Sequence, residues 1–168
     1  MDEYGKENST QKWIITGCVS VFVIAICCIA AVFGGLVWLG SMSTEGLAQI
    51  DVKAPTNVQQ GQVYAITVEI KNISNDEITL YSVDIEENLL RGFIITSVKP
   101  TYLDTYDYGF GGETYQTYSF DARIPPGQSL IVTFEGEAVL NGDFSGDVDV
   151  CLNSSFNCYT GFIRTIVE

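Results

Sequence analysis

The sequence predicts an all-β sandwich domain of seven to eight strands that follows a single transmembrane helix. Two observations support this prediction. An uncharged apolar run lies near the N-terminus, and from Ile50 onward short segments of alternating polarity are separated by Gly, Asn and Pro. No segment of this second part has helical periodicity. The chain of 168 residues has room for one domain and short appendages.

The apolar run covers residues 13–39. About 20 apolar residues are enough to cross the hydrocarbon core of a bilayer, so this run is long enough to span a membrane. Trp13 and Trp38 lie near its two ends, where amphipathic rings prefer the interface. A buried core helix is the alternative, but a small domain cannot cover a helix that is apolar on every side.

The basic residues around the run predict its orientation. Lys6 and Lys12 precede it, whereas Lys53 is the nearest basic residue after it. This bias predicts a cytoplasmic tail at residues 1–12 and a single-pass protein of the cell membrane with an extracytoplasmic C-terminal domain. The small-x-small sequence ending at Ser43 also fits a signal-peptidase site, so cleavage there remains an alternative to a retained anchor.

Small residues at a spacing of four lie within the predicted span, at Cys27, Ala31 and Gly35. A stripe of this kind lets membrane helices approach closely. It therefore supplies a candidate packing face for a partner helix.

Residues 40–49 are small and polar and predict a linker before a domain at 50–168. Strands are predicted at 62–72, 77–87, 89–98, 114–124, 128–140, 143–152 and 159–167. The first of these should bury Tyr64, Ile66, Val68 and Ile70 on one face. The second should place Thr79, Tyr81, Val83 and Ile85 on one face and Ile78 and Leu80 on the other. This many short strands with regular turns favour an immunoglobulin-like sandwich.

Cys151 and Cys158 flank a six-residue loop between the last two predicted strands. Opposite positions on a hairpin bring Cβ atoms within disulfide range. The closed ring would stabilise the domain by roughly 2.5 kcal/mol in the loop-entropy model. A disulfide suits the extracytoplasmic side, and two reduced, buried thiols are the alternative.

Residues 51–149 resemble the Ig-like conserved-repeat and CARDB-type adhesion modules of bacterial and archaeal surface proteins. The similar features are Gly61 before the strand with Tyr64, Ile66 and Val68, the Lys71-Asn72 turn, Gly92-Phe93 followed by Ser97-Val98, and Pro125-Pro126-Gly127-Gln128-Ser129 leading into Leu130-Ile131-Val132-Thr133-Phe134. The resemblance implies a sandwich that acts as a spacer, a stalk unit or an adhesive surface. The single copy and the C-terminal cysteine hairpin depart from that pattern.

The segment 102–118 combines aromatic side chains with glycines and acids. Aromatic rings in a Gly-rich loop supply large contact area at low entropic cost. The expected contacts to a protein or glycan partner are Tyr102, Tyr106, Tyr108, Phe110 and Tyr115. The alternative is a hairpin whose tyrosines cover the edge of the sandwich.

The net charge of −13 disfavours nucleic acid as a partner. Asp104, Asp107 and Glu113 offer hard oxygen donors for calcium, as do Asp143, Asp147 and Asp149, but no calcium-loop spacing links them, so neither a metal nor a cofactor is predicted. The chain has no His and no nucleophile motif. The pair Glu135 and Glu137 alternates along one strand face toward solvent, so no enzyme is predicted.

Taken together, these features predict a non-enzymatic, membrane-anchored surface module that binds or spaces an extracytoplasmic partner. An accessory subunit of a membrane complex, assembled through the predicted helix, is the alternative. Asn72 and Asn153 begin Asn-x-Ser sequences, which accept N-glycans in a eukaryotic secretory route.

Overall fold

The computed structural model describes residues 46–168. The predicted tail, the predicted span with Cys27, Ala31 and Gly35, and the predicted cleavage site at Ser43 lie outside the described residues. Within the described part, no helix has the length and apolar character needed to cross a bilayer.

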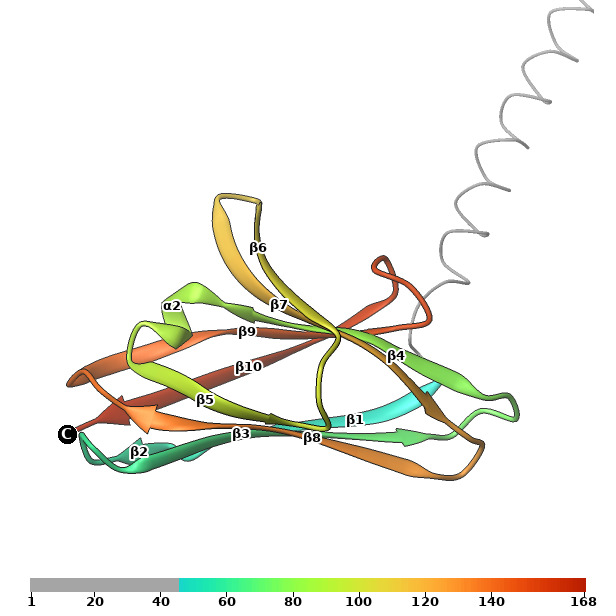
Figure 1. Cartoon of the computed structure of the whole chain (residues 1–168), viewed down its shortest axis with the longest axis horizontal. Helices are drawn as coiled ribbons and strands as arrows, with labels where there is room; N and C mark the ends of the chain where they lie inside the picture. The colour runs from blue at the N-terminus through green and yellow to red at the C-terminus, as the bar shows by residue number, and fades with distance from the viewer. Residues whose placement is uncertain (1–45) are drawn as a thin grey trace, which may run out of the picture. The chain divides into compact units, whose positions relative to one another are not determined.

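Ten strands in the described part form two sheets, which confirms the predicted all-β sandwich (Figure 1). The four-stranded sheet has the order β1 (Ala48–Lys53), β3 (Val63–Asn72), β8 (Ser129–Ala138) and β5 (Phe93–Lys99). The six-stranded sheet has the order β2 (Asn57–Val58), β10 (Cys158–Val167), β9 (Gly142–Leu152), β4 (Ile78–Glu86), β7 (Glu113–Ile124) and β6 (Asp104–Phe110). Strands β1, β2 and β6 were not among the predicted strands. Strand β1 includes the last two residues of the predicted linker.

The core lies between the two sheets. The predicted alternation in β3 is confirmed, because Tyr64, Ile66, Val68 and Ile70 are all fully buried. The Tyr64 ring stacks on Phe93 of β5 with 3.7 Å between ring centroids. Strand β5 approaches β8 closely at Gly136, where a Cβ atom would collide with the carbonyl oxygen of Ile94.

The predicted division of faces in β4 is wrong. Ile78 and Leu80 share the core with Val83 and Ile85, although the two pairs are out of phase along the strand. The cause is a register shift between Leu80 and Ser82, seen in the pairing of β4 with both neighbours. Such an irregularity reverses the side-chain alternation beyond it. Polar residues of the second half of β4 therefore face outward, away from the core.

Two further departures shape the region around β4. A short helix, α2 (Glu87–Leu90), precedes β5, so the predicted strand 89–98 begins four residues late. The segment 102–118, predicted as a Gly-rich recognition loop, is mostly a β-hairpin of β6 and β7. Its turn uses Gly111 and Gly112, both with positive φ, as a two-residue hairpin turn of type I′ requires. The hairpin projects beyond the rest of its sheet (Figure 1).

Candidate recognition site on the outer face of the six-stranded sheet

A row of polar side chains crosses the outer face of the six-stranded sheet. The directly paired residues along this row are Thr160 on β10, Asp149 on β9, Asp84 on β4, Thr117 on β7 and Tyr106 on β6. Residues paired in this way lie on the same face with neighbouring Cβ atoms about 5 Å apart. The register of the sheet therefore brings together side chains from five separate strands.

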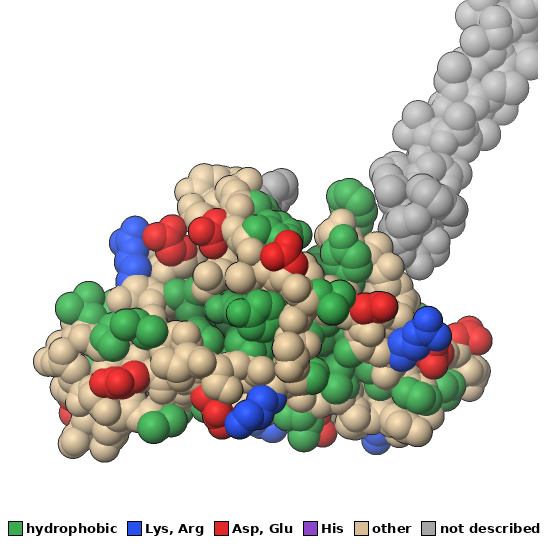
Figure 2. Space-filling view, in the orientation of Figure 1, with side chains coloured by type: hydrophobic (Ala, Val, Ile, Leu, Met, Phe, Trp, Pro, Cys, Tyr) green, Lys and Arg blue, Asp and Glu red, His purple; other side chains and the backbone are tan. Residues whose placement is uncertain are grey.

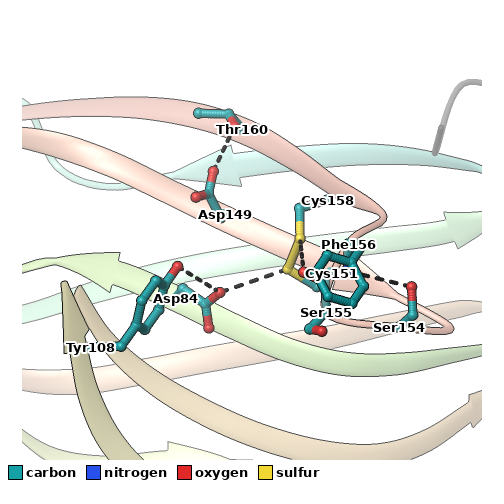
Figure 3. Close-up of a disulfide and its surroundings, with 9 residues drawn as sticks. All are labelled: Asp84, Tyr108, Asp149, Cys151, Ser154, Ser155, Phe156, Cys158 and Thr160. Atoms are coloured by element: carbon teal, nitrogen blue, oxygen red, sulfur yellow. Dashed lines mark hydrogen bonds between the residues drawn. A yellow bond between two sulfur atoms is a disulfide. The ribbon is translucent and has the colours of Figure 1, made fainter. Parts of the chain in front are cut away.

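Two segments enclose the middle of this row. The β6–β7 hairpin lies on one side, and the loop between β9 and β10 lies on the other. Between them is a recess of about 400 Å³, lined by Ser82, Asp84, Tyr106, Tyr108, Thr117, Asp149, Ser155 and Phe156. Figure 3 shows Asp84 between the Tyr108 ring and the loop that carries Phe156.

Asp84 is a buried carboxylate with little compensation. The residue is only 6% exposed. The Tyr108 hydroxyl donates a long hydrogen bond of 3.5 Å to Oδ2. The Cys151 Sγ lies 3.7 Å from the same oxygen, but a disulfide sulfur has no hydrogen to donate. Oδ1 has no hydrogen-bond partner, and neither has Oγ1 of the buried Thr117.

Burial raises the pKa of Asp84 above the usual range of an aspartate. The Thr117 and Ser82 hydroxyls lie nearby and oppose this rise, although Thr117 Oγ1 does not reach hydrogen-bonding geometry with Oδ1, and the charge of Asp149 adds to the rise. Burial also raises the pKa of Asp149, although Thr160 donates a 2.5 Å hydrogen bond to its Oδ1. Burial, followed by the charges of Asp84 and Asp149, raises the pKa of Tyr108 to about 12. Each shift reflects a site that disfavours the negative charges it contains.

No basic side chain of residues 46–168 compensates these two aspartates. The ion pairs in this part of the chain join Lys53 to Asp51, Lys99 to Glu135, Arg123 to Glu77 and Arg164 to Asp143. Figure 2 shows Lys and Arg side chains beside Asp and Glu side chains at several places on the face it presents. The ion-paired cations of the described part therefore contact exposed carboxylates elsewhere, and none of them neutralises the recess.

Cys151 and Cys158 form a disulfide, as the sequence predicted. It closes the loop that carries Phe156 (Figure 3). Phe156 is 90% exposed and lies beside the recess. The loop is also attached to β4, because the Asn153 Oδ1 accepts a 2.8 Å hydrogen bond from the backbone N–H of Thr79. These links restrict the position of the Phe156 backbone while the ring remains free to contact a partner.

The predicted aromatic contacts separate into different environments. Tyr106 is 48% exposed at the recess, and the half-buried Tyr108 stacks on Tyr115 with centroids 5.4 Å apart. Tyr115 itself is only 6% exposed, and its hydroxyl donates to Glu113. Tyr102 packs edge-on against the buried Tyr118. Phe110 belongs to β6, but its side chain lies outside the described part of the structure.

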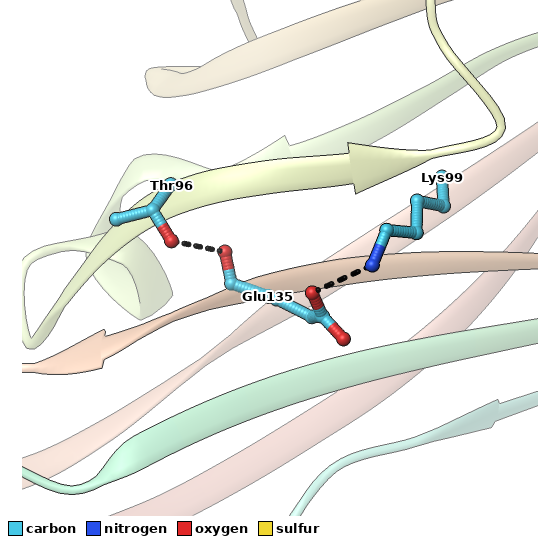
Figure 4. A network of polar contacts seen from close by, with 3 residues as sticks. All are labelled: Thr96, Lys99 and Glu135. Carbon is cyan, nitrogen blue, oxygen red and sulfur yellow. Dashed lines mark hydrogen bonds and ion pairs between the residues drawn. The ribbon is translucent and has the colours of Figure 1, made fainter.

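The calcium candidates do not converge. Asp104 and Asp107 lie on β6, and Glu113 begins β7. Across residues 46–168 no three acidic or cysteine side chains are grouped as a metal ion requires. Glu135, part of the carboxylate pair considered for glycoside hydrolysis, lies on β8 and pairs with Lys99 at 3.2 Å (Figure 4).

No motif in the sequence points to Ser82, Asp84, Thr117 or Phe156 as residues of a site. One indication was present: Asp84 and Glu86 alternate with Val83 and Ile85, so a buried strand had acidic residues on its second face. Phe156 could have been noted as a large apolar residue at the centre of the predicted disulfide ring. The pairing of Asp84 with Asp149 depends on strand order, which local patterns do not give.

These features define a two-sheet, immunoglobulin-like β-sandwich module. No protein-family model and no curated protein matches the chain. Its fold is similar to that of the cohesin module of a family 33 glycoside hydrolase from Clostridium perfringens (13% identity, TM-score 0.44, covering 73% of this chain and 98% of that chain). It is also similar to the CARDB domain of the PF1109 protein from Pyrococcus furiosus, solved in complex with di-metal ions (13% identity, TM-score 0.41, covering 72% of this chain and 87% of that chain). A third similar structure is the sporulation control protein Spo0M from Bacillus subtilis (16% identity, TM-score 0.44, covering 73% of this chain). The chain spans about half the length of that protein. At these identities the likeness concerns the fold alone.

Proposed function

We propose that the chain is a non-enzymatic, membrane-anchored recognition module that binds an extracytoplasmic partner through the recess between the β6–β7 hairpin and the β9–β10 loop. The observation that supports it most is the buried carboxylate of Asp84, whose Oδ1 lacks a partner at the floor of a recess with aromatic walls. The apolar run 13–39 supplies the anchor.

The cost of this arrangement favours a functional origin. Like charges directly opposite on neighbouring strands destabilise a sheet, and a buried polar atom without a partner costs about 1–3 kcal/mol. Asp84 and Asp149 impose both penalties on one place. Perturbed carboxylates that gather in a recess are typical of binding and reactive sites.

The surrounding architecture is suited to recognition. Projecting segments held by a rigid sandwich are the usual place for contact residues. Tyr106 and Phe156 belong to two such segments and expose large aromatic surfaces toward the same recess. Exposed aromatic side chains of this kind carry much of the energy of many protein interfaces.

The proposal is tested by affinity purification of the full chain from its native cells, with quantification of co-purified partners. Tyr106→Ala and Phe156→Ala should each reduce recovery of the specific partner at least tenfold while the thermal midpoint stays nearly unchanged. Ile131→Ala is the matched control, because Ile131 is an exposed apolar residue of β8 in the other sheet. Equal recovery from the recess variants and the wild type would refute the proposal.

A further inference from the structure

We infer that the recess binds an alkylammonium group, which would lie against the Asp84 and Asp149 carboxylates with its alkyl chain between Tyr106, Tyr108 and Phe156. This inference rests on the proposed function and names the chemistry of its ligand. Three properties of the recess support it: its unpaired negative charge, its unused acceptor and its aromatic walls.

The charge requirement comes from the strand register. Asp84 and Asp149 are directly opposite on β4 and β9, so their carboxylates share the floor of one recess. A cation placed between them would turn a repulsive pair into an attractive group of three charges. A neutral ligand such as a sugar would leave that repulsion in place. Within the described part of the chain, the ion-paired Lys and Arg side chains all contact other carboxylates.

The hydrogen-bonding requirement comes from Asp84. An ionised carboxylate only accepts hydrogen bonds, and an ammonium group offers three donors and no acceptor. Oδ1 of Asp84 has no donor at present, and Oδ2 receives only the long bond from Tyr108. An ammonium group, admitted by a small local shift where needed, would donate hydrogen bonds to this carboxylate. It would bring no acceptor that needs a partner of its own.

The walls suit the remainder of such a ligand. Cations bind favourably over aromatic faces, and alkyl chains are covered by apolar rings. Tyr106 and Phe156 face the recess with large exposed surfaces. The Tyr108 hydroxyl is a donor at physiological pH, where an unperturbed tyrosine is already neutral, and its pKa is raised further, to about 12. A volume of about 400 Å³ is within the range of small-molecule sites.

Ligand-observed NMR on the full chain tests the inference with blocked lysine, Nα-acetyl-lysine N-methylamide, as the probe. The corresponding norleucine compound is the control, because it keeps the alkyl chain and lacks the ammonium group. The lysine compound should bind at least tenfold more tightly than the norleucine compound. Equal binding, or binding by neither compound, would overturn the inference.

Variants assign the binding to the recess. Asp84→Asn should weaken binding of the lysine compound at least tenfold, and Phe156→Ala should weaken it several-fold. Asp121→Asn is the matched control, since Asp121 is an exposed carboxylate of β7 that does not line the recess. A similar loss in all three variants would show a nonspecific effect of surface charge and refute the site. A denaturation curve for each variant excludes unfolding as the cause.

A second comparison separates the two sources of an alkylammonium group. A free diamine, 1,5-diaminopentane, represents a small-molecule ligand, and a blocked tripeptide with a central lysine represents a protein side chain. Tighter binding of the tripeptide assigns the recess to a protein partner, whereas tighter binding of the diamine assigns it to a small amine. If no amine binds but partner recovery still depends on Tyr106 and Phe156, the cation inference fails while the proposed function stands.

Discussion

Asp84 combines burial, a like-charged neighbour and an unpartnered oxygen at one residue. We expect Asp84→Asn to raise the free energy of unfolding at pH 7 by about 1 kcal/mol, because it removes a buried charge that lacks compensation. Chemical denaturation of the wild type and the variant measures this difference. Destabilisation by the variant would mean that the charge at Asp84 already has a favourable partner.

The pH dependence provides the control for this prediction. The folded-state pKa of Asp84 is raised, so the folded state holds the proton more tightly than the unfolded state does. Stability should therefore fall as the pH rises from the ordinary aspartate range through the raised pKa. Asp84→Asn should reduce this slope without abolishing it, because the pKa values of Asp147 and Asp149 are raised as well. Parallel curves for both proteins would contradict the assignment to Asp84.

Asn72 illustrates a residue whose role could be only half predicted. The sequence placed it at a strand end before a turn, and the structure buries it completely. Its Nδ2 donates to the carbonyl oxygens of Asp76 and Ile124, and its Oδ1 accepts from the backbone and hydroxyl of Ser74. Asn72 thus ties the turn after β3 to the end of β7.

Loss of this network should be costly. Asn72→Ala leaves buried carbonyl groups without donors and should lower the free energy of unfolding by about 3 kcal/mol. Asn75→Ala, at an exposed position in the same turn, should change it by less than about 0.5 kcal/mol. Thermal or urea unfolding checks both values. A glycan on Asn72 would be incompatible with this fold, because its Nδ2 is buried and donates two hydrogen bonds, whereas the other Asn-x-Ser sequence begins at the exposed Asn153.

At the level of elements, the β6–β7 hairpin divides its tyrosines between packing and exposure. Tyr108 stacks on the buried Tyr115, whereas Tyr106 lines the recess without a stacked partner among the described aromatic pairs. Tyr108→Ala should therefore lower the free energy of unfolding by about 2 kcal/mol, and Tyr106→Ala by less than about 0.5 kcal/mol. Denaturation of the two single variants checks the division. Equal losses would show that the entire hairpin serves as cover for the sheet.

The strands were largely predictable because apolar and polar residues alternate along a strand that buries one face and exposes the other. This holds for β3, β8 and β10, where the buried residues recur at every second position. It fails at β4, where the shift near Tyr81 reverses the alternation and no residue type marks the reversal. The short pairing of β2 with β10 involves two residues and has no detectable period.

The candidate site was less predictable than the fold. The sequence indicated the tyrosines of the hairpin and the cysteine pair, since both are local patterns. It did not indicate that Asp84 and Asp149 are neighbours. These residues are 65 positions apart in the sequence, and they come together only because β9 and β4 are adjacent in the sheet. Thr117 and Phe156 join the site through the same arrangement. A recess made from strands distant in sequence is a tertiary property.

For the molecule as a whole, the predicted placement outside the membrane can be tested through its thiols. The disulfide between Cys151 and Cys158 requires an oxidising compartment in most organisms. Full chain from native cells, alkylated under denaturing conditions before reduction, should show no label on either cysteine. The cysteines of the predicted span serve as internal controls for the reagent. Labelled Cys151 or Cys158 would contradict an extracytoplasmic domain.

Strand β4 also has a consequence for how this chain can evolve. Its two halves alternate in opposite phase, and Tyr81 joins them. A substitution at the exposed Tyr81 leaves both halves in place. An insertion or deletion of one residue between Leu80 and Val83 would instead turn either the apolar pair of the first half or the acidic pair of the second half to the wrong side. Lineages carrying this domain should therefore vary freely in the identity of that residue while keeping the residue count across it fixed.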